Sequence, residues 1–186
     1  MSISGAAKLA GIMGWPVAHS RSPALHGYWL ERYGIDGAYV PMAVKPENLR
    51  RSLQALPLLG FAGCNLTIPH KEEALRAVDD LEPSAKRAGG VNTVVINARG
   101  QLIGSSTDGY GFIAALRVEA PAFDPSRAPA VVLGAGGAAR ARGNRCVDGL
   151  GMLLHQAAPG FEAWFGVKPA IDSGLREAVL ATLHKI

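Results

Sequence analysis

Apolar residues in the first part of the chain occur either in short continuous runs or at helical spacing. Residues 8–14, 38–44 and 61–68 are apolar runs of the length expected for buried strands. Between them, residues 22–34 and 46–56 place apolar side chains three or four positions apart, as an amphipathic helix does. The pattern therefore predicts alternating strands and helices that build an α/β sheet.

Polar residues cluster where the third predicted strand ends. Asn65 and Thr67 are two positions apart, so their side chains leave the same face of a strand. Pro69 is suited to the first position of a helix, which would place His70 and Lys71 on an exposed first turn. Because open α/β sheets bind ligands at the carboxyl ends of their strands, we expect a polar site here.

The next stretch predicts a change of strand direction. Residues 91–97 and 102–105 read as two strands joined by a turn at 98–101, which is a hairpin signal. A helix follows from 107 to 117, and the three prolines of 121–129 indicate a linker. The expected fold is α/β, with a mixed open sheet flanked by helices.

A glycine-rich run follows a second apolar strand at 130–133. A strand, a glycine loop and a helix open a dinucleotide-binding βαβ unit, in which glycines let the backbone approach a pyrophosphate. A complete domain of this kind needs on the order of 100 residues. Here the pattern of the C-terminal helices already begins near Gly149, soon after the glycine run. We interpret 129–147 as a truncated, Rossmann-like remnant of a dinucleotide-binding domain. The glycine run consists of Gly134, Ala135, Gly136, Gly137 and Ala138.

The remainder of the chain has the apolar spacing of helices. One helix is predicted over 150–157, a new one is expected to restart at Pro159, and Ser173 is predicted to cap the last. We expect these C-terminal helices, 148–186, to complete a substrate-binding catalytic domain formed by 1–120.

Composition and charge narrow the classes of partner. The chain of 186 residues has a net charge of +4, but its Lys and Arg residues are scattered, which favours a small anionic substrate over nucleic acid. No segment approaches the ~18 apolar residues of a membrane span, and no secretory leader is evident. Cys64 and Cys146 match no metal spacing, so we expect no metal site and a cytoplasmic protein.

Each candidate residue also has an ordinary structural explanation. Ser22, followed by Pro23, suits a helix N-cap, and so does Asp108 at the start of its helix. Lys71 taken alone is a typical solvated helix residue, and Gln156 a typical surface residue. Only the joint occurrence of these residues, in one order along the chain, favours a binding site.

Five motifs together carry a resemblance to a known family. They are HSRSP at 19–23, NLTIPHK at 65–71, GVNT at 90–93, TDG at 107–109 and LHQA at 154–157. In this order they resemble the shikimate dehydrogenases, and the glycine run adds to the likeness. The resemblance covers nearly the whole chain.

The resemblance implies an enzyme that reduces 3-dehydroshikimate to shikimate with NADPH, in the chorismate pathway of aromatic amino acid biosynthesis. It implies that Lys71 and Asp108 are catalytic and that Ser20 and Ser22 hold the substrate carboxylate. It assigns the remaining substrate contacts to Asn65, Thr67, Asn92 and Gln156. It assigns the cofactor NADP to Gly134, Ala135, Gly136, Gly137, Ala138 and, beside the nicotinamide, Gly149.

The expected chemistry also follows from the residue types. Hydride transfer to a ketone leaves an alkoxide that must take up a proton. An ammonium group beside the carbonyl oxygen is a suitable donor, so Lys71 is the candidate acid/base group.

The chain departs from the family in the nucleotide-binding region. The basic segment that reads the 2′-phosphate is missing, and Ser106 stands where the family motif usually has Asn. Either the full protein has residues that this sequence lacks, or the deletion is real. If the deletion is real, the alternative is a non-catalytic shikimate-binding module. A close enzymatic alternative is a quinate/shikimate dehydrogenase. The sequence leaves open the choice of NADP over NAD, and whether the protein is a monomer or homodimer.

Overall fold

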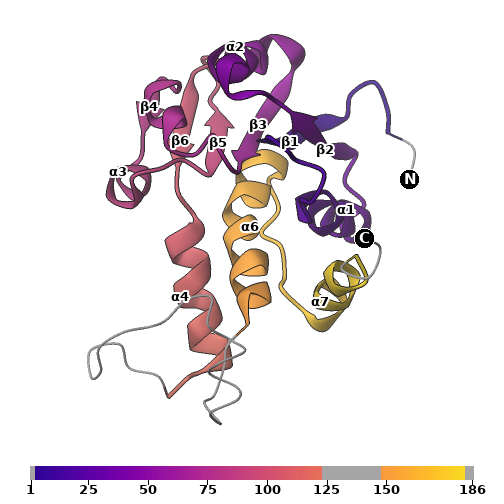
Figure 1. Cartoon of the computed structure of the whole chain (residues 1–186). Helices are drawn as coiled ribbons and strands as arrows, with labels where there is room; N and C mark the ends of the chain where they lie inside the picture. Colours follow the sequence, from indigo (N-terminus) through magenta and orange to yellow (C-terminus); the bar gives the residue numbers. More distant parts are fainter. Residues whose placement is uncertain (1–2, 123–147, 183–186) are drawn as a thin grey trace.

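A six-stranded mixed sheet with helices on both faces forms the centre of the molecule (Figure 1). The computed structural model describes residues 3–122 and 148–182. The strand order is β2-β1-β3-β5-β6-β4, which confirms the predicted α/β fold with a mixed open sheet. The predicted strand at 130–133, the glycine run 134–138 and Cys146 lie outside the described residues.

The elements follow the predicted order closely. The strands are β1 (Lys8–Gly14), β2 (Gly37–Ala43), β3 (Phe61–Leu66), β4 (Asp80–Leu81), β5 (Thr93–Ile96) and β6 (Leu102–Ser105). The α-helices are α1 (Ser22–Arg32), α2 (Leu49–Ala55), α3 (Pro83–Ala88), α4 (Asp108–Glu119), α6 (Gly149–Phe165) and α7 (Ser173–Leu180). Short 3₁₀ helices lie at Pro46–Asn48, Pro57–Leu59 and Glu73–Arg76. The two-residue strand β4 was not predicted, because so short a segment has no readable periodicity.

The direction of the strands gathers several chain segments at one edge. β1 runs parallel to β2 and β3, whereas β5 is antiparallel to both β3 and β6. The predicted hairpin is thereby confirmed. Because β5 is reversed, its first residues lie beside the last residues of β3, and Asn65 stands opposite Thr93. The end of one strand and the start of another therefore meet where the site was expected.

The C-terminal helices share a core with the first strands and α1. Trp29, Leu154 and Phe161 are almost fully buried in this cluster. Trp164 extends from α6 to the sheet, where its indole Nε1 donates a hydrogen bond of 3.1 Å to the carbonyl oxygen of Val94. This packing agrees with the predicted union of the C-terminal helices with the N-terminal segment, although the domain boundaries themselves stay a prediction.

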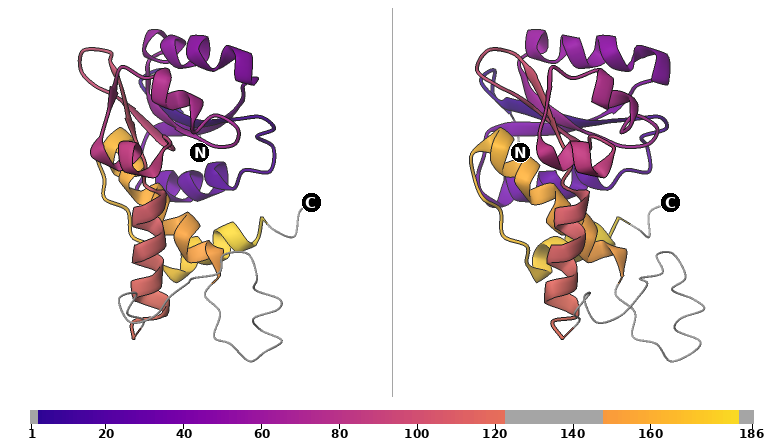
Figure 2. Two further views of the ribbon diagram at one scale, coloured as in Figure 1. Left: turned by 60° about the vertical axis from the view of Figure 1, so that its left-hand side comes forward. Right: turned by 90° about the vertical axis from the view of Figure 1, so that its left-hand side faces the viewer.

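The opposite face of the sheet is covered by α2. Its leucines Leu49 and Leu53, together with Leu56, are at most 2% exposed, as the predicted apolar face requires. Figure 2 shows α1 and α2 on opposite sides of the sheet. Cys64 is buried in this second cluster as a free thiol, and burial raises its pKa above the usual value.

The prediction that a new helix restarts at Pro159 is wrong. Helix α6 runs without interruption from Gly149 to Phe165, with Pro159 inside it. Proline removes one backbone donor, but Leu154 and Phe161 anchor both sides of the gap in the core. Tertiary packing therefore outweighs the local cost. Among the described residues, no helix combines the length and apolar content needed to cross a membrane.

The prediction that Pro69 begins a helix is also wrong. The chain turns at residues 68–72 after a cis peptide bond between Ile68 and Pro69, and a 3₁₀ helix begins only at Glu73. His70 is 1% exposed, because its ring turns inward and its Nε2 lies 2.8 Å from the carbonyl oxygen of Val44. Burial lowers the pKa of His70. Lys71 consequently leaves a turn rather than a helix.

Two helix N-caps lie one residue before the predicted ones, at Arg21 and Asp172. Ser22 is the first residue of α1 and caps nothing; instead, the Ser20 hydroxyl oxygen accepts from its backbone N–H at 3.3 Å. Ser173 likewise lies inside α7, where Asp172 is the N-cap and accepts from the Leu175 N–H at 2.9 Å. A carboxylate is as good a cap as a hydroxyl, so residue preference alone does not decide between these two neighbours.

His26 is a fully buried histidine in the first core cluster. Its ring stacks on Tyr39 with centroids 3.9 Å apart and meets the edge of Trp29 at 5.6 Å. Neither ring nitrogen makes a well-aligned hydrogen bond within the described residues. Burial lowers the pKa of His26 from 6.5 to about 3, and the nearby Asn65 side chain opposes this shift only in part. The folded protein therefore holds this ring neutral.

Protonation of His26 is expected to destabilise the fold in acid. Between about pH 6.5 and pH 3 the unfolded chain binds a proton on this residue and the folded chain does not. The free energy of unfolding should therefore fall as the pH is lowered, with a contribution that approaches about 1.4 kcal/mol per pH unit. Denaturant unfolding of the native chain and of His26→Phe at several pH values measures the difference in slope.

An exposed histidine provides the control for this measurement. His19→Phe changes a side chain on the surface and should keep the native slope. Equal slopes in the native chain and in His26→Phe would contradict the assignment.

Candidate functional site

A cleft of about 380 Å³ lies at the edge of the sheet where β1 and β3 end. Every residue predicted to contact substrate lines this cleft, although these residues come from three loops, β3, α1, α4 and α6. The predicted residues that line it are Ser20, Ser22, Asn65, Thr67, Lys71, Asn92, Asp108, Gln156 and Gly149. The described ranges contain no cluster of three or more His, Cys, Asp or Glu side chains able to hold a metal ion.

Lys71 and Asp108 form an ion pair inside the cleft. The Lys71 Nζ lies 2.7 Å from Asp108 Oδ2, and about a third of each side chain is exposed. At this exposure the attraction contributes little to stability, but it fixes an ammonium group where solvent and ligands can reach it. The alternative reading of Lys71 as a solvated helix residue is wrong about the helix, because Lys71 lies in a turn, although its side chain is partly exposed.

The alternative explanation of Asp108 as a helix N-cap is wrong, because its carboxylate bonds to other side chains. The N-cap of α4 is Thr107, and no side chain caps this helix. The Asp108 Oδ1 instead accepts a hydrogen bond of 2.8 Å from the Asn92 side chain. Both carboxylate oxygens are thus occupied, one by an amide and one by the Lys71 ammonium, which holds the carboxylate in a single orientation.

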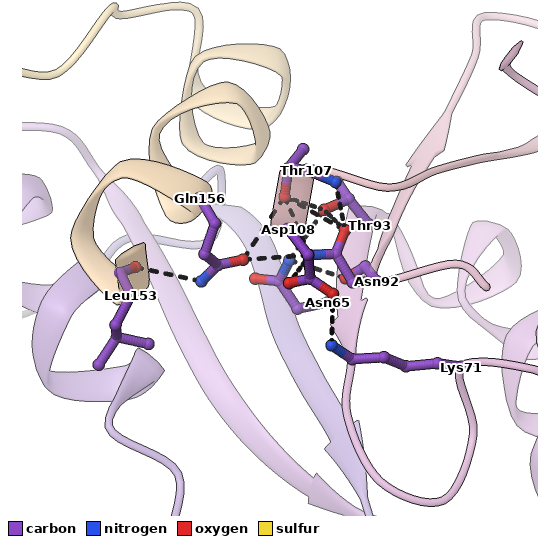
Figure 3. A network of polar contacts seen from close by, with 8 residues as sticks. All are labelled: Asn65, Lys71, Asn92, Thr93, Thr107, Asp108, Leu153 and Gln156. Carbon is purple, nitrogen blue, oxygen red and sulfur yellow. Dashed lines mark hydrogen bonds and ion pairs between the residues drawn. The ribbon is translucent and has the colours of Figure 1, made fainter. Parts of the chain in front are cut away.

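Asn92 is the centre of the polar network at the base of the cleft (Figure 3). Its Oδ1 accepts from the Thr107 backbone N–H and from the Thr93 hydroxyl, both at 2.9 Å. Because a backbone N–H can only donate, this contact fixes which atom of the amide is oxygen. The Nδ2 therefore donates towards Asp108 Oδ1 at 2.8 Å and Gln156 Oε1 at 3.2 Å.

Asn65 connects the end of β3 to this network. Its Nδ2 donates to the Asn92 carbonyl oxygen at 3.0 Å and to the Thr93 hydroxyl at 3.1 Å. Thr93 in turn donates to Asn92 Oδ1. From Asn65 through Thr93 and Asn92 to Asp108, every bond is donated in the same direction. Such aligned bonds polarise and strengthen one another.

Three residues of the network were not predicted from the sequence. Thr93 and Thr107 are 2% and 8% exposed, and their only sequence signal is that each adjoins a predicted residue. Tyr39 donates its phenolic hydrogen to Asn65 Oδ1 at 2.6 Å. It lies within an ordinary strand, 26 residues before its partner, so no local pattern marks it.

The first loop supplies the groups suited to an anion. Ser20, Arg21 and Ser22 line the cleft together with His19. Hydroxyl donors and a guanidinium suit a carboxylate. The amides and hydroxyls at the base suit the hydroxyl groups of a small ring, and the ammonium of Lys71 suits proton transfer. The cleft can therefore receive a small acid that carries several hydroxyl groups.

Two family models match this chain. Residues 12–94 match the shikimate dehydrogenase substrate binding domain, and residues 149–180 match the shikimate 5′-dehydrogenase C-terminal domain. Neither match includes the glycine run, so its assignment to NADP stays a prediction.

Curated relatives are similar along almost the whole chain. The shikimate dehydrogenase (NADP(+)) of Paramagnetospirillum magneticum is 39% identical over 276 residues, which span 96% of this chain and 100% of that protein. The enzyme of Rhodospirillum rubrum is also 39% identical, over 279 residues, 96% of this chain and 99% of that protein. Since this chain has 186 residues, at least 90 of the 276 aligned positions, the difference of the two lengths, have no counterpart in it.

Solved structures have the same fold. Shikimate 5-dehydrogenase from Thermus thermophilus, in complex with shikimate, is 28% identical with a TM-score of 0.82 and covers 95% of this chain and 99% of its own. A quinate dehydrogenase from Corynebacterium glutamicum, 21% identical with a TM-score of 0.79, covers 94% and 99% and shows the fold alone. The expected resemblance is thus confirmed, and the chain belongs to the family of NADP(+)-dependent shikimate dehydrogenases.

Proposed function

We propose that this protein catalyses the reversible NADPH-dependent reduction of 3-dehydroshikimate to shikimate. The observation that carries the proposal is the Lys71–Asp108 pair, 2.7 Å apart, in a cleft lined by every predicted substrate residue. Membership of the family supports the choice of substrate and cofactor.

In this proposal the first loop binds the carboxylate of the substrate, and the base of the cleft binds its ring hydroxyls. Ser20 and Ser22 donate to the substrate carboxylate, with the positive charge of Arg21 nearby. Ring hydroxyls contact side chains at the base of the cleft. These are Asn65, Thr67, Asn92 and Gln156.

Lys71 is proposed to move the proton of the reaction. A bound nicotinamide cofactor supplies or accepts the hydride at the carbon that carries the oxygen. Lys71 gives a proton to the carbonyl oxygen as it becomes an alkoxide, and takes one back in the reverse direction. Asp108 orients the ammonium. Because the Lys71 side chain is 37% exposed, solvent can restore the proton after each turnover.

Gly149 is the proposed contact with the nicotinamide in the described residues. It is the first residue of α6 and lines the cleft. A Cβ added at this position would meet no atom of residues 3–122 or 148–182 within 4 Å, so these parts of the chain leave space above it for a flat ring. The glycine run, Gly134 to Ala138, is proposed to hold the pyrophosphate.

We also propose that the protein works in the cytoplasm, as a monomer or a homodimer, on this small anionic substrate. A quinate/shikimate dehydrogenase is the neighbouring alternative. Kinetics with quinate and with NAD separate the two activities.

Substitution of Lys71 tests the proton-transfer assignment. Lys71→Met should lower turnover of 3-dehydroshikimate by about 10²- to 10⁴-fold, because no other ammonium among the described residues lines the cleft. Shikimate affinity should change much less. NADPH consumption and calorimetric titration measure the two quantities. Lys86→Met, on the exposed side of α3, is the matched control and should keep native turnover. Near-normal turnover of Lys71→Met would contradict the assignment.

Substitution of Gly149 tests the cofactor face of the cleft. Gly149→Ala should raise the KM for NADPH by about tenfold, a loss of ~1.4 kcal/mol, because a methyl group enters the space of the nicotinamide. Shikimate affinity should stay within about twofold of the native value. Gly27→Ala, in α1, also adds a Cβ into open space and should change neither quantity. An unchanged KM for NADPH in Gly149→Ala would contradict the proposed contact.

A second candidate function is favoured by one observation. At least 90 positions of the curated relatives have no counterpart here, and a nucleotide-binding domain needs on the order of 100 residues. If this chain has no complete nucleotide-binding domain, it is a shikimate-binding module without turnover.

Calorimetry on the 186-residue chain, of intact mass 19.4 kDa, separates the two candidates. The second candidate predicts heat on addition of shikimate, none on addition of NADPH, and no NADPH consumption with 3-dehydroshikimate. Measurable consumption by a chain of that mass would exclude it. A measured mass well above 19.4 kDa would instead show that the functional protein carries further residues.

A further inference from the structure

Tyr39 stands behind the cleft and lies near two parts of it. It is 7% exposed in β2 and does not line the cleft. Its hydroxyl donates to Asn65 Oδ1 at 2.6 Å, and the Ser22 side chain lies nearby and lowers the pKa of the phenol slightly against the effect of burial. Ser22 belongs to the anion-suited loop and Asn65 to the base of the cleft. The phenol therefore holds Asn65, which is proposed to contact the ring hydroxyls of the substrate, and lies near Ser22, which is proposed to contact its carboxylate.

The position of the phenol is fixed by its aromatic neighbours. The ring stacks on His26 at 3.9 Å with an interplanar angle of 10°, and Trp164 lies 6.0 Å away. Burial raises the pKa of Tyr39 well above its ordinary value, so its oxygen keeps the proton that it donates. The hydroxyl is thus a rigid donor.

The contacts of Asn65 define what its side chain offers to a ligand. Both Nδ2 hydrogens are used within the protein, on the Asn92 carbonyl oxygen and the Thr93 hydroxyl. The Oδ1 has two lone pairs, of which Tyr39 occupies one. Asn65 can therefore contact a substrate hydroxyl only by accepting its hydrogen. Tyr39 holds the accepting oxygen in place.

Tyr39 also begins the series of aligned hydrogen bonds described above. The bonds run from its hydroxyl through Asn65, Thr93 and Asn92 to Asp108, each group donating to the next. A donor at the start of such a series fixes the rotamer of the first amide and supports the groups after it.

We propose that Tyr39 is a positioning residue for substrate recognition: it fixes the Asn65 side chain as a hydrogen-bond acceptor. The inference rests on the proposed function, because it assumes that shikimate occupies the cleft. It adds a residue that acts through others and touches no substrate itself.

A double-mutant cycle on shikimate binding tests this proposal. Tyr39→Phe keeps the stacked ring and removes only the hydroxyl. In the native background it should weaken calorimetric shikimate binding about tenfold. In an Asn65→Ala background it should change binding by less than about twofold, since the amide that it positions is already absent. Where turnover is measurable, the KM for shikimate should rise while kcat changes little.

A matched tyrosine controls for a general loss of stability. The Tyr33 hydroxyl accepts from the Ala170 N–H at 2.8 Å and lies outside the cleft lining. Tyr33→Phe should lower Tm about as much as Tyr39→Phe yet leave shikimate affinity unchanged. Native affinity in Tyr39→Phe, or an equal loss in the Asn65→Ala background, would overturn the inference. Absence of shikimate binding by the native chain would instead overturn the proposed function.

Discussion

The antiparallel pairing of β5 with β3 is the constraint on which the site depends. It sets Asn65 opposite Thr93, and the Leu66 N–H donates to the Asn92 carbonyl oxygen at 2.9 Å. A parallel strand would present its carboxyl end at this edge; the reversed strand presents its start. The amide of residue 92 consequently lies next to the end of β3, within reach of the first turn of α4 and of α6.

The position of α6 relative to the sheet is set by one close approach. Gly63 of β3 has a φ of +153°, and a Cβ there would meet the Val94 carbonyl oxygen at 2.1 Å and the Trp164 indole Nε1 at 2.4 Å. Only glycine leaves room for the indole to donate to the sheet at this point. The same helix carries Gln156 and Gly149 to the cleft, so the glycine in β3 indirectly determines where the C-terminal helix contributes to the site.

The sequence predicts the strands, the hairpin and the membership of the site, because each depends on periodicity or on a residue type beside a strand end. It fails where tertiary contacts outweigh local preference. Pro159 lies within α6 because the core holds both sides of it, and His70 is buried because it contacts the Val44 carbonyl. Tyr39 could not be found at all: its partner is 26 residues away, and nothing local separates it from any other strand tyrosine.

The side-chain amides at the base of the cleft have their hydrogen-bond partners within the described residues. Asn92 and Asn65 obtain their amide partners from β5, α4, α6 and β2, and none of these bonds depends on residues 123–147. The proposed contacts with the acid therefore lie in the described residues, apart from the glycine run that is proposed to hold the nucleotide. The two proposed functions, dehydrogenase and shikimate-binding module, require the same geometry at Lys71 and Asp108; they differ in whether a hydride donor reaches the substrate carbon that is proposed to lie beside that ammonium.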